Sequence, residues 1–77
     1  MTIEKVFGEV LKKKRIESEL SQEGLAYISD LDRSFISMLE RGKRKPTITT
    51  IFRLSSCLNI KPSELIKEVE AKVDSYK

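Results

Sequence analysis

Apolar residues recur at spacings of three and four along almost the whole chain, which is the spacing of helices that bury one side. No segment has the pattern of a strand pair, a repeat or a low-complexity linker. The sequence therefore predicts an all-α fold, a compact bundle of five helices. We expect these helices at about residues 3–18, 22–29, 33–41, 48–58 and 62–75.

The predicted helix boundaries carry the residue types that begin and end helices. Four predicted helices follow a residue whose side-chain oxygen can cap a helix N-terminus: Thr2, Ser21, Asp32 and Thr47. Pro62 suits the first position of the last helix, where its missing N–H costs nothing. Three residues that tolerate left-handed backbone follow predicted helices: Asp30, Gly42 and Asn59. These signals support the five segments.

A single cysteine and the absence of histidine limit the chemistry of the chain. Cys57 cannot form an intramolecular disulfide, and a zinc site of the usual Cys/His type is excluded. No apolar run approaches the roughly 20 residues of a membrane span, and the first residues lack a signal-peptide pattern. We expect one cytoplasmic domain over residues 1–77, with no metal, no cofactor and no membrane partner.

The positive charge lies in two clusters. Lys and Arg number 15 against 12 Asp and Glu, a net charge of +3. One cluster spans Lys12–Arg15 and the other spans Arg41–Lys45, whereas the residues from 61 onward are balanced. Lysines on a helix often only solvate its outer side, and this interpretation stays open for the first cluster. The second cluster follows a predicted short helix and favours nucleic acid as a partner.

The two short central helices have the pattern of a helix-turn-helix. Two short helices that cross at a steep angle need a small side chain where they approach, and Ala26 meets this need. The turn falls at Asp30. Apolar side chains on both sides of the turn would hold the angle: Leu25, Leu31, Ile36 and Leu39. The motif is expected at about residues 22–41.

The stretch SQEGLAYISDLDRSFISMLERGKRKPT, residues 21–47, resembles the lambda-repressor-like (Cro/repressor, Xre-like) helix-turn-helix regulators. The resemblance rests on Ser21-Gln22, Leu25-Ala26, Ile36-Ser37, Glu40-Arg41-Gly42, Arg44 and Pro46. The short length and the Leu31–Ser37 segment are most similar to the controller proteins of restriction–modification systems. Glu19 and Asp30 depart from the family, which usually has glycine or asparagine before the Leu-Ser-Gln stretch and glycine at the turn. The resemblance implies a DNA-binding transcriptional regulator.

The second helix of such a motif enters the major groove with its N-terminal residues against base edges. We therefore expect base contacts from Arg33, Ser34 and Ser37. Arg33 is the strongest candidate, because its guanidinium can donate two hydrogen bonds to one guanine. Arg33 could instead pair with Asp30 or Asp32, and the two serines could contact phosphates or only water.

Phosphate contacts fix the register of such a complex. The resemblance implies a phosphate contact from Gln22, and we expect another from Ser21 beside it. Arg41 and Lys43 follow the recognition helix and would flank the groove. By the same resemblance, Arg44 is expected to reach bases.

The resemblance also assigns structural roles. An arginine near the end of the first helix pairs with a glutamate in this family, and Arg15 and Glu40 match these two residues. A phosphate contact is the alternative for Arg15. Phe35 could contact a thymine methyl group, but an aromatic residue at this spacing is more often part of the core.

One helix-turn-helix covers only a few base pairs, so we expect a twofold homodimer on a palindromic operator. Helices four and five, about residues 48–76, are expected to form its interface. The fourth helix should turn Ile48, Ile51, Leu54 and Leu58 inward. Four apolar residues are candidates for the interface: Phe52, Ile66, Val69 and Val73. Alternatively, these residues cover the core of the monomer.

The sequence thus predicts a regulator, not an enzyme, because nucleophile motifs and phosphate-binding glycine loops are lacking. Cys57 has apolar neighbours and is expected to be an inert hydrophobic residue. The predicted role is the controller of a restriction–modification system, with double-stranded DNA, a second copy and RNA polymerase as candidate partners. An antitoxin-type repressor or a protein-binding adapter with the same fold is the alternative.

Overall fold

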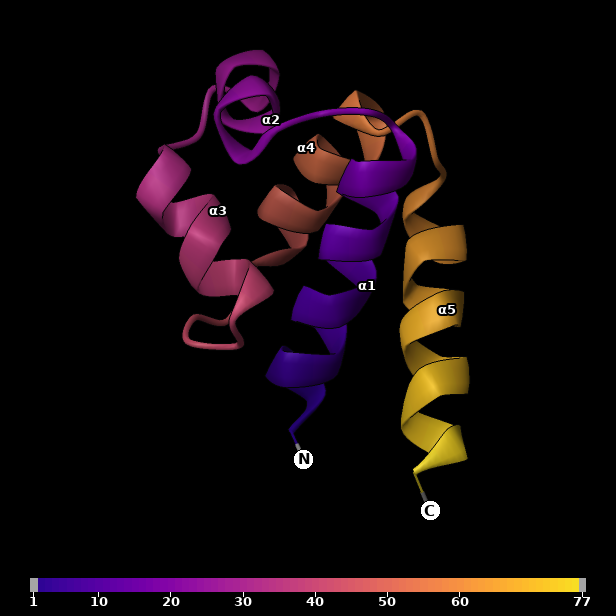
Figure 1. Cartoon of the computed structure of the whole chain (residues 1–77). Helices are drawn as coiled ribbons and strands as arrows, with labels where there is room; N and C mark the ends of the chain where they lie inside the picture. Colours follow the sequence, from indigo (N-terminus) through magenta and orange to yellow (C-terminus); the bar gives the residue numbers. More distant parts are fainter. Residues whose placement is uncertain (1, 77) are drawn as a thin grey trace.

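The computed structural model describes residues 2–76, and within this range it contains helices and no strand (Figure 1). The five helices are α1 (Ile3–Glu17), α2 (Gln22–Ser29), α3 (Arg33–Glu40), α4 (Ile48–Cys57) and α5 (Pro62–Ser75). The predicted all-α, five-helix fold is confirmed. None of these helices combines the length and the apolar character that a membrane span requires, as judged over the described residues.

Helix α1 lies at the centre of the arrangement. It packs against α3 on one side and α5 on the other, while α2 packs against both α3 and α4 at one end of the molecule (Figure 1). Helix α5 runs antiparallel to α1, so both ends of the described chain lie at the same end of the molecule. This packing leaves the outer side of α3 uncovered.

Three of the four predicted N-caps are confirmed. Thr2, Ser21 and Thr47 each accept a hydrogen bond from the backbone N–H three residues later, at 3.1, 2.9 and 3.1 Å. The prediction for Asp32 is wrong. Its backbone precedes α3 as a cap residue should, but its side chain accepts no α3 backbone N–H. The carboxylate instead accepts the hydroxyl of Ser34.

Helices α1, α3 and α4 end one residue earlier than predicted. Ser18, Arg41 and Leu58, the predicted last residues, have ψ values of 3°, 0° and 3°. At these values the backbone leaves the α-helix, whose ψ is near −42°. The three residues are therefore C-caps.

Left-handed backbone occurs at all three predicted positions and at one more. Asp30, Asn59 and Gly42 have φ values of 57°, 56° and 73°. Glu19 also has a positive φ of 58°, at a position where the resembled family prefers glycine or asparagine. A Cβ on Gly42 would come within 2.8 Å of the Lys5 Cα, so this glycine lets the loop after α3 lie against the start of α1.

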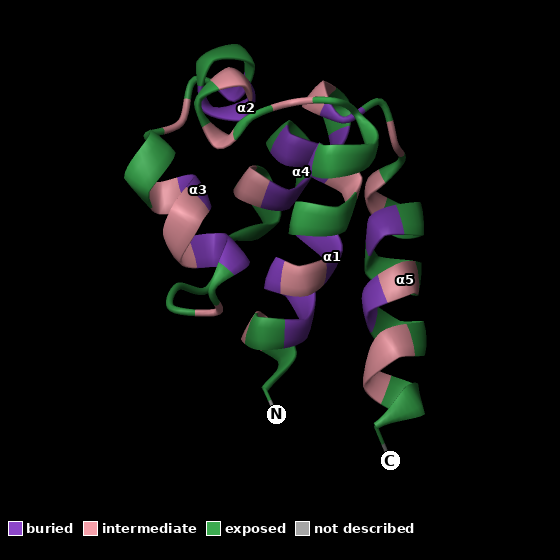
Figure 2. Ribbon diagram, viewed as in Figure 1, coloured by how far each residue is buried: buried purple, intermediate pink, exposed green. Residues whose placement is uncertain are grey.

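The core lies where the helices face one another, and the ribbon in Figure 2 is coloured purple at the buried residues. Within residues 2–76, thirteen buried apolar residues form it: Val6, Phe7, Val10, Leu11, Leu25, Ala26, Ile36, Leu39, Ile51, Leu54, Leu58, Leu65 and Val69. Ile48 was predicted to face inward but is 72% exposed. Ile48 occupies the first turn of α4, and no neighbouring helix covers it.

Gly8 sets the distance between α1 and α3. A Cβ at this position would lie 2.3 Å from the Leu39 carbonyl oxygen and 2.5 Å from that of Glu40. Real Cβ atoms do not approach backbone oxygens so closely, so only glycine fits here. The C-terminal half of α3 therefore rests directly on the backbone of α1.

Candidate DNA interface

The two short helices α2 and α3 hold each other through a buried apolar contact. Ala26 is buried on α2, and Ile36 and Leu39 are buried on α3. Leu31, in the turn between the helices, packs against the same cluster. A side chain larger than alanine at position 26 would meet this packed core. The placement of Ala26 agrees with the role that the sequence suggests for it.

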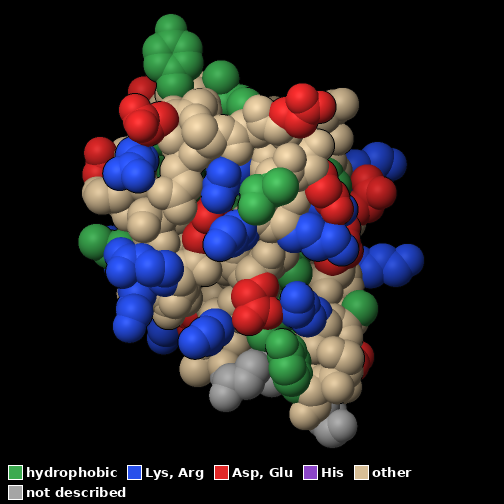
Figure 3. Space-filling view, in the orientation of Figure 1, with side chains coloured by type: hydrophobic (Ala, Val, Ile, Leu, Met, Phe, Trp, Pro, Cys, Tyr) green, Lys and Arg blue, Asp and Glu red, His purple; other side chains and the backbone are tan. Residues whose placement is uncertain are grey.

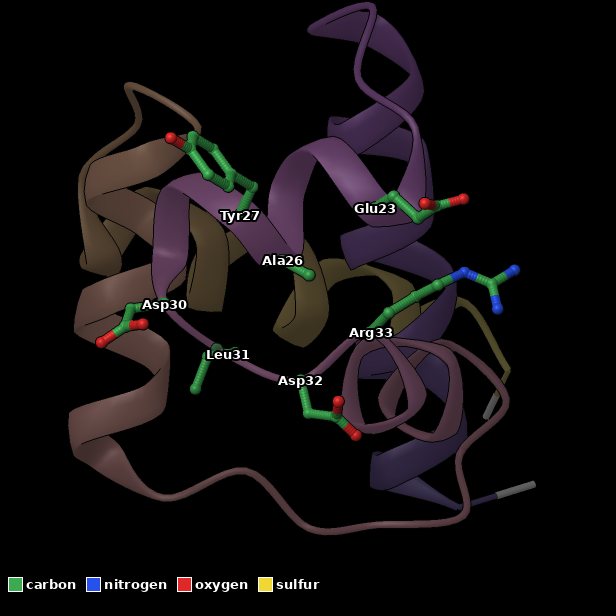
Figure 4. Close-up of a pocket in the computed structure, with 7 residues that line it drawn as sticks. All are labelled: Glu23, Ala26, Tyr27, Asp30, Leu31, Asp32 and Arg33. Atoms are coloured by element: carbon green, nitrogen blue, oxygen red, sulfur yellow. The ribbon is translucent and has the colours of Figure 1, made fainter.

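The opposite side of α3 faces solvent. Arg33 and Ser34 are exposed and Ser37 is half-buried, whereas Ile36 and Leu39 face the core. Figure 4 shows the Arg33 side chain extending outward from the start of α3. Within residues 2–76 Arg33 forms no ion pair, so the proposed pairing with Asp30 or Asp32 is absent. Its guanidinium is available to a ligand.

The loop after α3 is tied back to the helix by Arg44. The Arg44 guanidinium lies over the ring of Phe35, 5.4 Å from its centroid, and Nη1 is 3.9 Å from the Met38 sulfur. A cation on an aromatic face is attracted by the ring quadrupole. Phe35 also packs partly against the core, so it holds Arg44 beside the exposed side of α3. Sequence reasoning found both residues but not this contact.

A basic surface joins α3 to this loop. Arg41, Lys43, Arg44 and Lys45 are all exposed. Figure 3 shows Lys and Arg side chains gathered over α3 and the loop that follows it. The Arg41 Nε donates only a long hydrogen bond, 3.4 Å, to the Ser37 carbonyl. This surface can bind an anion such as a phosphate backbone.

A buried polar cluster connects α1, α2 and α3. Arg15 donates from Nε and Nη2 to the two Glu40 carboxylate oxygens at 2.7 and 3.1 Å, and from Nη1 to the Leu20 carbonyl at 2.8 Å. The side chains of Arg15 and Glu40 are only 11% and 3% exposed. The ion pair that the resemblance implies is present, so Arg15 is not a free phosphate ligand.

Gln22 belongs to the same cluster. Its Nε2 donates to Glu40 Oε1 at 3.0 Å. An amide nitrogen carries two hydrogens, so the second remains for a phosphate oxygen. Ser21 accepts the Gly24 N–H through its hydroxyl oxygen and keeps its own hydrogen to donate. Both residues start α2, at the end of the helix that favours anions.

The predicted interface residues differ in burial. Phe52 and Ile66 are 59% and 43% exposed, and Val73 is half-buried against the core. Val69 is only 6% exposed and belongs to the core, because α5 turns it toward α1 and α4. We therefore remove Val69 from the interface prediction. An apolar groove of about 290 Å³ lies near these residues, with Ile3, Ile51 and Ile66 in its lining.

Three comparisons place the chain among known proteins. Residues 11–65 match the model of the helix-turn-helix family. The chain is 43% identical over 65 residues to control protein C.MunI of Mycoplasma sp, an alignment covering 83% of this chain and 88% of the relative. It also resembles the crystal structure of the restriction–modification controller protein C.AhdI from Aeromonas hydrophila. The TM-score is 0.78 and the identity 42%, covering 80% of this chain and 94% of that one.

A variant of the controller protein C.Esp1396I extends the likeness to the full length. Its crystal structure matches with a TM-score of 0.90 and 30% identity, and covers all of this chain and 98% of that one. The family match includes α2, α3 and the basic loop that were described above. The chain belongs to the helix-turn-helix family of DNA-binding regulators, and within it is similar to the control proteins of restriction–modification systems.

Proposed function

We propose that this chain regulates transcription by inserting the start of α3 into the major groove of a specific DNA site. One observation carries this proposal: Arg33 and Ser34 face solvent at the start of α3, beside a basic loop, while the other side of the helix is buried. Arg33, Ser34, Ser37 and Arg44 would contact bases. Ser21, Gln22, Arg41 and Lys43 would contact phosphates.

The similarity to control proteins supports a finer role. We propose that the chain controls the genes of a restriction–modification system and also its own gene. We also propose that it acts in the cytoplasm, where the DNA lies. Its action would be binding rather than catalysis. The gene context tests the role: methyltransferase and endonuclease genes beside this one support it, and their absence favours an antitoxin-type repressor.

An Arg33→Ala variant is expected to lose sequence discrimination. A bidentate contact to guanine contributes about 1–3 kcal/mol, so preference for the specific site should fall roughly 5- to 150-fold. Binding to unrelated duplexes should change much less, because phosphate contacts dominate it. Competition titrations with a selected palindrome and a scrambled duplex measure both quantities. Unchanged discrimination would remove Arg33 from base recognition.

A Lys43→Ala variant is expected to bind all sequences more weakly and with less dependence on salt. Each lost phosphate contact lowers the slope of log K against log salt concentration by about 0.9. Lys67→Ala, an exposed lysine on α5, is the matched control and should leave the slope unchanged. Equal slopes for wild-type and Lys43→Ala would show that Lys43 is only solvated.

We propose a homodimer formed through α4 and α5 that reads a palindromic operator. Phe52 and Ile48 lie four residues apart on α4, so they share one side of the helix, and both are largely exposed. The apolar groove adds apolar surface from both helices, because Ile51 of α4 and the exposed Ile66 of α5 lie in its lining. Exposed apolar side chains gathered in this way are typical of association surfaces. The reading residues lie outside this surface.

A Phe52→Lys variant is expected to dissociate the dimer. Burial of a lysine ammonium in an apolar interface should raise the dissociation constant roughly tenfold or more. Sedimentation should then give the mass of one 8.9 kDa chain where the wild-type gives twice this mass. Tyr27→Lys is the control, because Tyr27 is 88% exposed but lies on α2. If both variants remain dimeric, the interface lies elsewhere.

RNA polymerase is the further protein partner that we propose. An open pocket of about 500 Å³ beside Arg33 has Glu23, Tyr27 and Asp30 in its lining, as Figure 4 shows. Phosphates would repel these carboxylates, whereas a basic protein surface would attract them. Transcription with purified polymerase, from promoters with the bound site moved in steps, tests this contact. Activation at one spacing supports it, and repression at every spacing contradicts it.

A further inference from the structure

The start of α3 pairs two polar side chains that both face solvent. Ser34 donates its hydroxyl hydrogen to Oδ2 of Asp32. The direction of this bond is fixed by chemistry, since an ionised carboxylate has lone pairs but no hydrogen. Serine carries only one hydroxyl hydrogen. While the pair is intact, Ser34 can only accept hydrogen bonds from other partners.

We infer that Asp32 is a specificity-determining residue, which makes Ser34 select an adenine or a cytosine on the contacted strand. The inference rests on the proposed function, in which the start of α3 enters the major groove. A free serine hydroxyl can donate or accept a hydrogen bond, and it therefore suits both a base edge that presents an acceptor oxygen or nitrogen and one that presents an amino group. A hydroxyl that only accepts needs an amino group. Adenine N6 and cytosine N4 are the amino groups of the major groove.

The charge of Asp32 acts in the same direction. Its exposed carboxylate is also an acceptor, and it would be attracted by an amino group and repelled by guanine O6, thymine O4 and phosphate oxygens. Arg33, the next residue, carries only donors and suits guanine. The first turn of α3 thus presents donors at Arg33 and acceptors at the Asp32–Ser34 pair. At two neighbouring base positions of the DNA site, the protein would therefore donate hydrogen bonds to one base and accept a hydrogen bond from the other.

Ser37 supplies an internal comparison. It lies one turn further along α3, and among the described residues its hydroxyl has no carboxylate partner. Its hydrogen stays free to rotate, so Ser37 should accept either kind of base edge. The two serines have the same side chain on the same helix and differ in their neighbour. Ser37→Ala is therefore the matched control for Ser34→Ala.

The test is selection of binding sites from duplexes with randomised sequence, using the full chain and its variants. The position at which Ser34→Ala loses selectivity identifies the base that Ser34 contacts. There the wild-type should prefer adenine or cytosine over guanine or thymine by roughly tenfold. Asp32→Asn should reduce this preference to about twofold or less, because an amide can donate to Ser34 and free its hydrogen. The same variant should bind unrelated duplexes more tightly, since it removes a negative charge.

Base analogues give a second readout that a loss of folding cannot imitate. At the selected position, adenine is replaced by purine, or cytosine by 2-pyrimidinone, so that only the amino group is lost. The wild-type and Ser37→Ala should lose roughly tenfold in affinity for the modified duplex relative to the natural one. Ser34→Ala and Asp32→Asn should lose about twofold or less.

Several results would overturn the inference. The preference could survive in Asp32→Asn, or the selected base could be guanine or thymine. If Asp32→Asn lowers the preference as much in a Ser34→Ala background as it does in the wild-type, the carboxylate reads the base itself and does not act through Ser34. These results leave the proposed function intact, because sequence-specific binding persists. Failure of the wild-type to bind any duplex at low salt would overturn both.

Discussion

A Glu40→Ala variant is expected to lose about 3–5 kcal/mol of its free energy of unfolding, the usual effect of removing one partner from a buried ion pair. The Arg15 guanidinium would remain buried with only the Leu20 carbonyl as a partner, and Gln22 would lose its acceptor. A domain of this size has a total of roughly 4–12 kcal/mol. Urea denaturation, monitored by circular dichroism, should therefore show a lower midpoint and a shortened native baseline.

The Lys72–Glu9 pair provides the control for this loss. It joins α5 to α1 at 3.3 Å, but both side chains are 39% exposed. Solvent-exposed pairs contribute about 0–1 kcal/mol, so Lys72→Met should stay close to wild-type. An Arg15→Met, Glu40→Leu double variant should be more stable than Glu40→Ala, because no charge is left unpaired. A Glu40→Ala midpoint near that of Lys72→Met would contradict the structural role of Glu40.

Gly8→Ala is expected to destabilise the protein although alanine is the better helix former. The added methyl would lie 2.3 and 2.5 Å from two backbone oxygens of α3, which cannot rotate away as a side chain would. Overpacking of this kind costs about 1–3 kcal/mol or more, which exceeds the gain of about 1 kcal/mol in helix propensity. Thermal unfolding measures the result, which should be a lower melting temperature.

Gly24→Ala separates the clash from the effect of helix propensity. Gly24 also lies inside a helix, but the nearest atoms to an added Cβ belong to side chains, Ser21 Oγ at 3.2 Å and a Leu20 methyl at 3.6 Å. We expect this variant within about 1 kcal/mol of wild-type. If both alanine variants are equally stable, α1 and α3 do not approach as closely as described.

The helices were predictable because their signals are local. The spacing of apolar residues sets which side of a helix turns inward, and Ser21 and Thr47 cap their helices through hydrogen bonds to residues three positions away. Local signals also explain the error at Asp32. Its carboxylate had two possible donors within reach, the α3 backbone and the Ser34 hydroxyl, and the sequence does not decide between them.

The parts that could not be predicted depend on contacts between distant segments. The spacing of apolar residues assigns Ile48 and Val69 each to one side of its helix. Whether another helix covers that side depends on how the helices pack, which the spacing does not show. Gly8 gives no sign in the sequence of the α3 backbone that lies against it. For the site, the resemblance supplied Arg15 and Glu40, whereas the Arg44–Phe35 contact needs the path of the loop after α3.

The two sides of helix α3 have separate roles, one in the fold and one in DNA recognition, and this separation favours evolutionary change of the DNA target. Ile36 and Leu39 hold the fold, while the side chains of Arg33 and Ser34 add nothing to the core. Exchanges at such surface positions usually change stability by no more than about 0.5 kcal/mol. A descendant, or a designed relative, can thus acquire a new target sequence without first becoming less stable. Variants of this one fold that bind different DNA sites, with no binding to each other's sites, should therefore be obtainable.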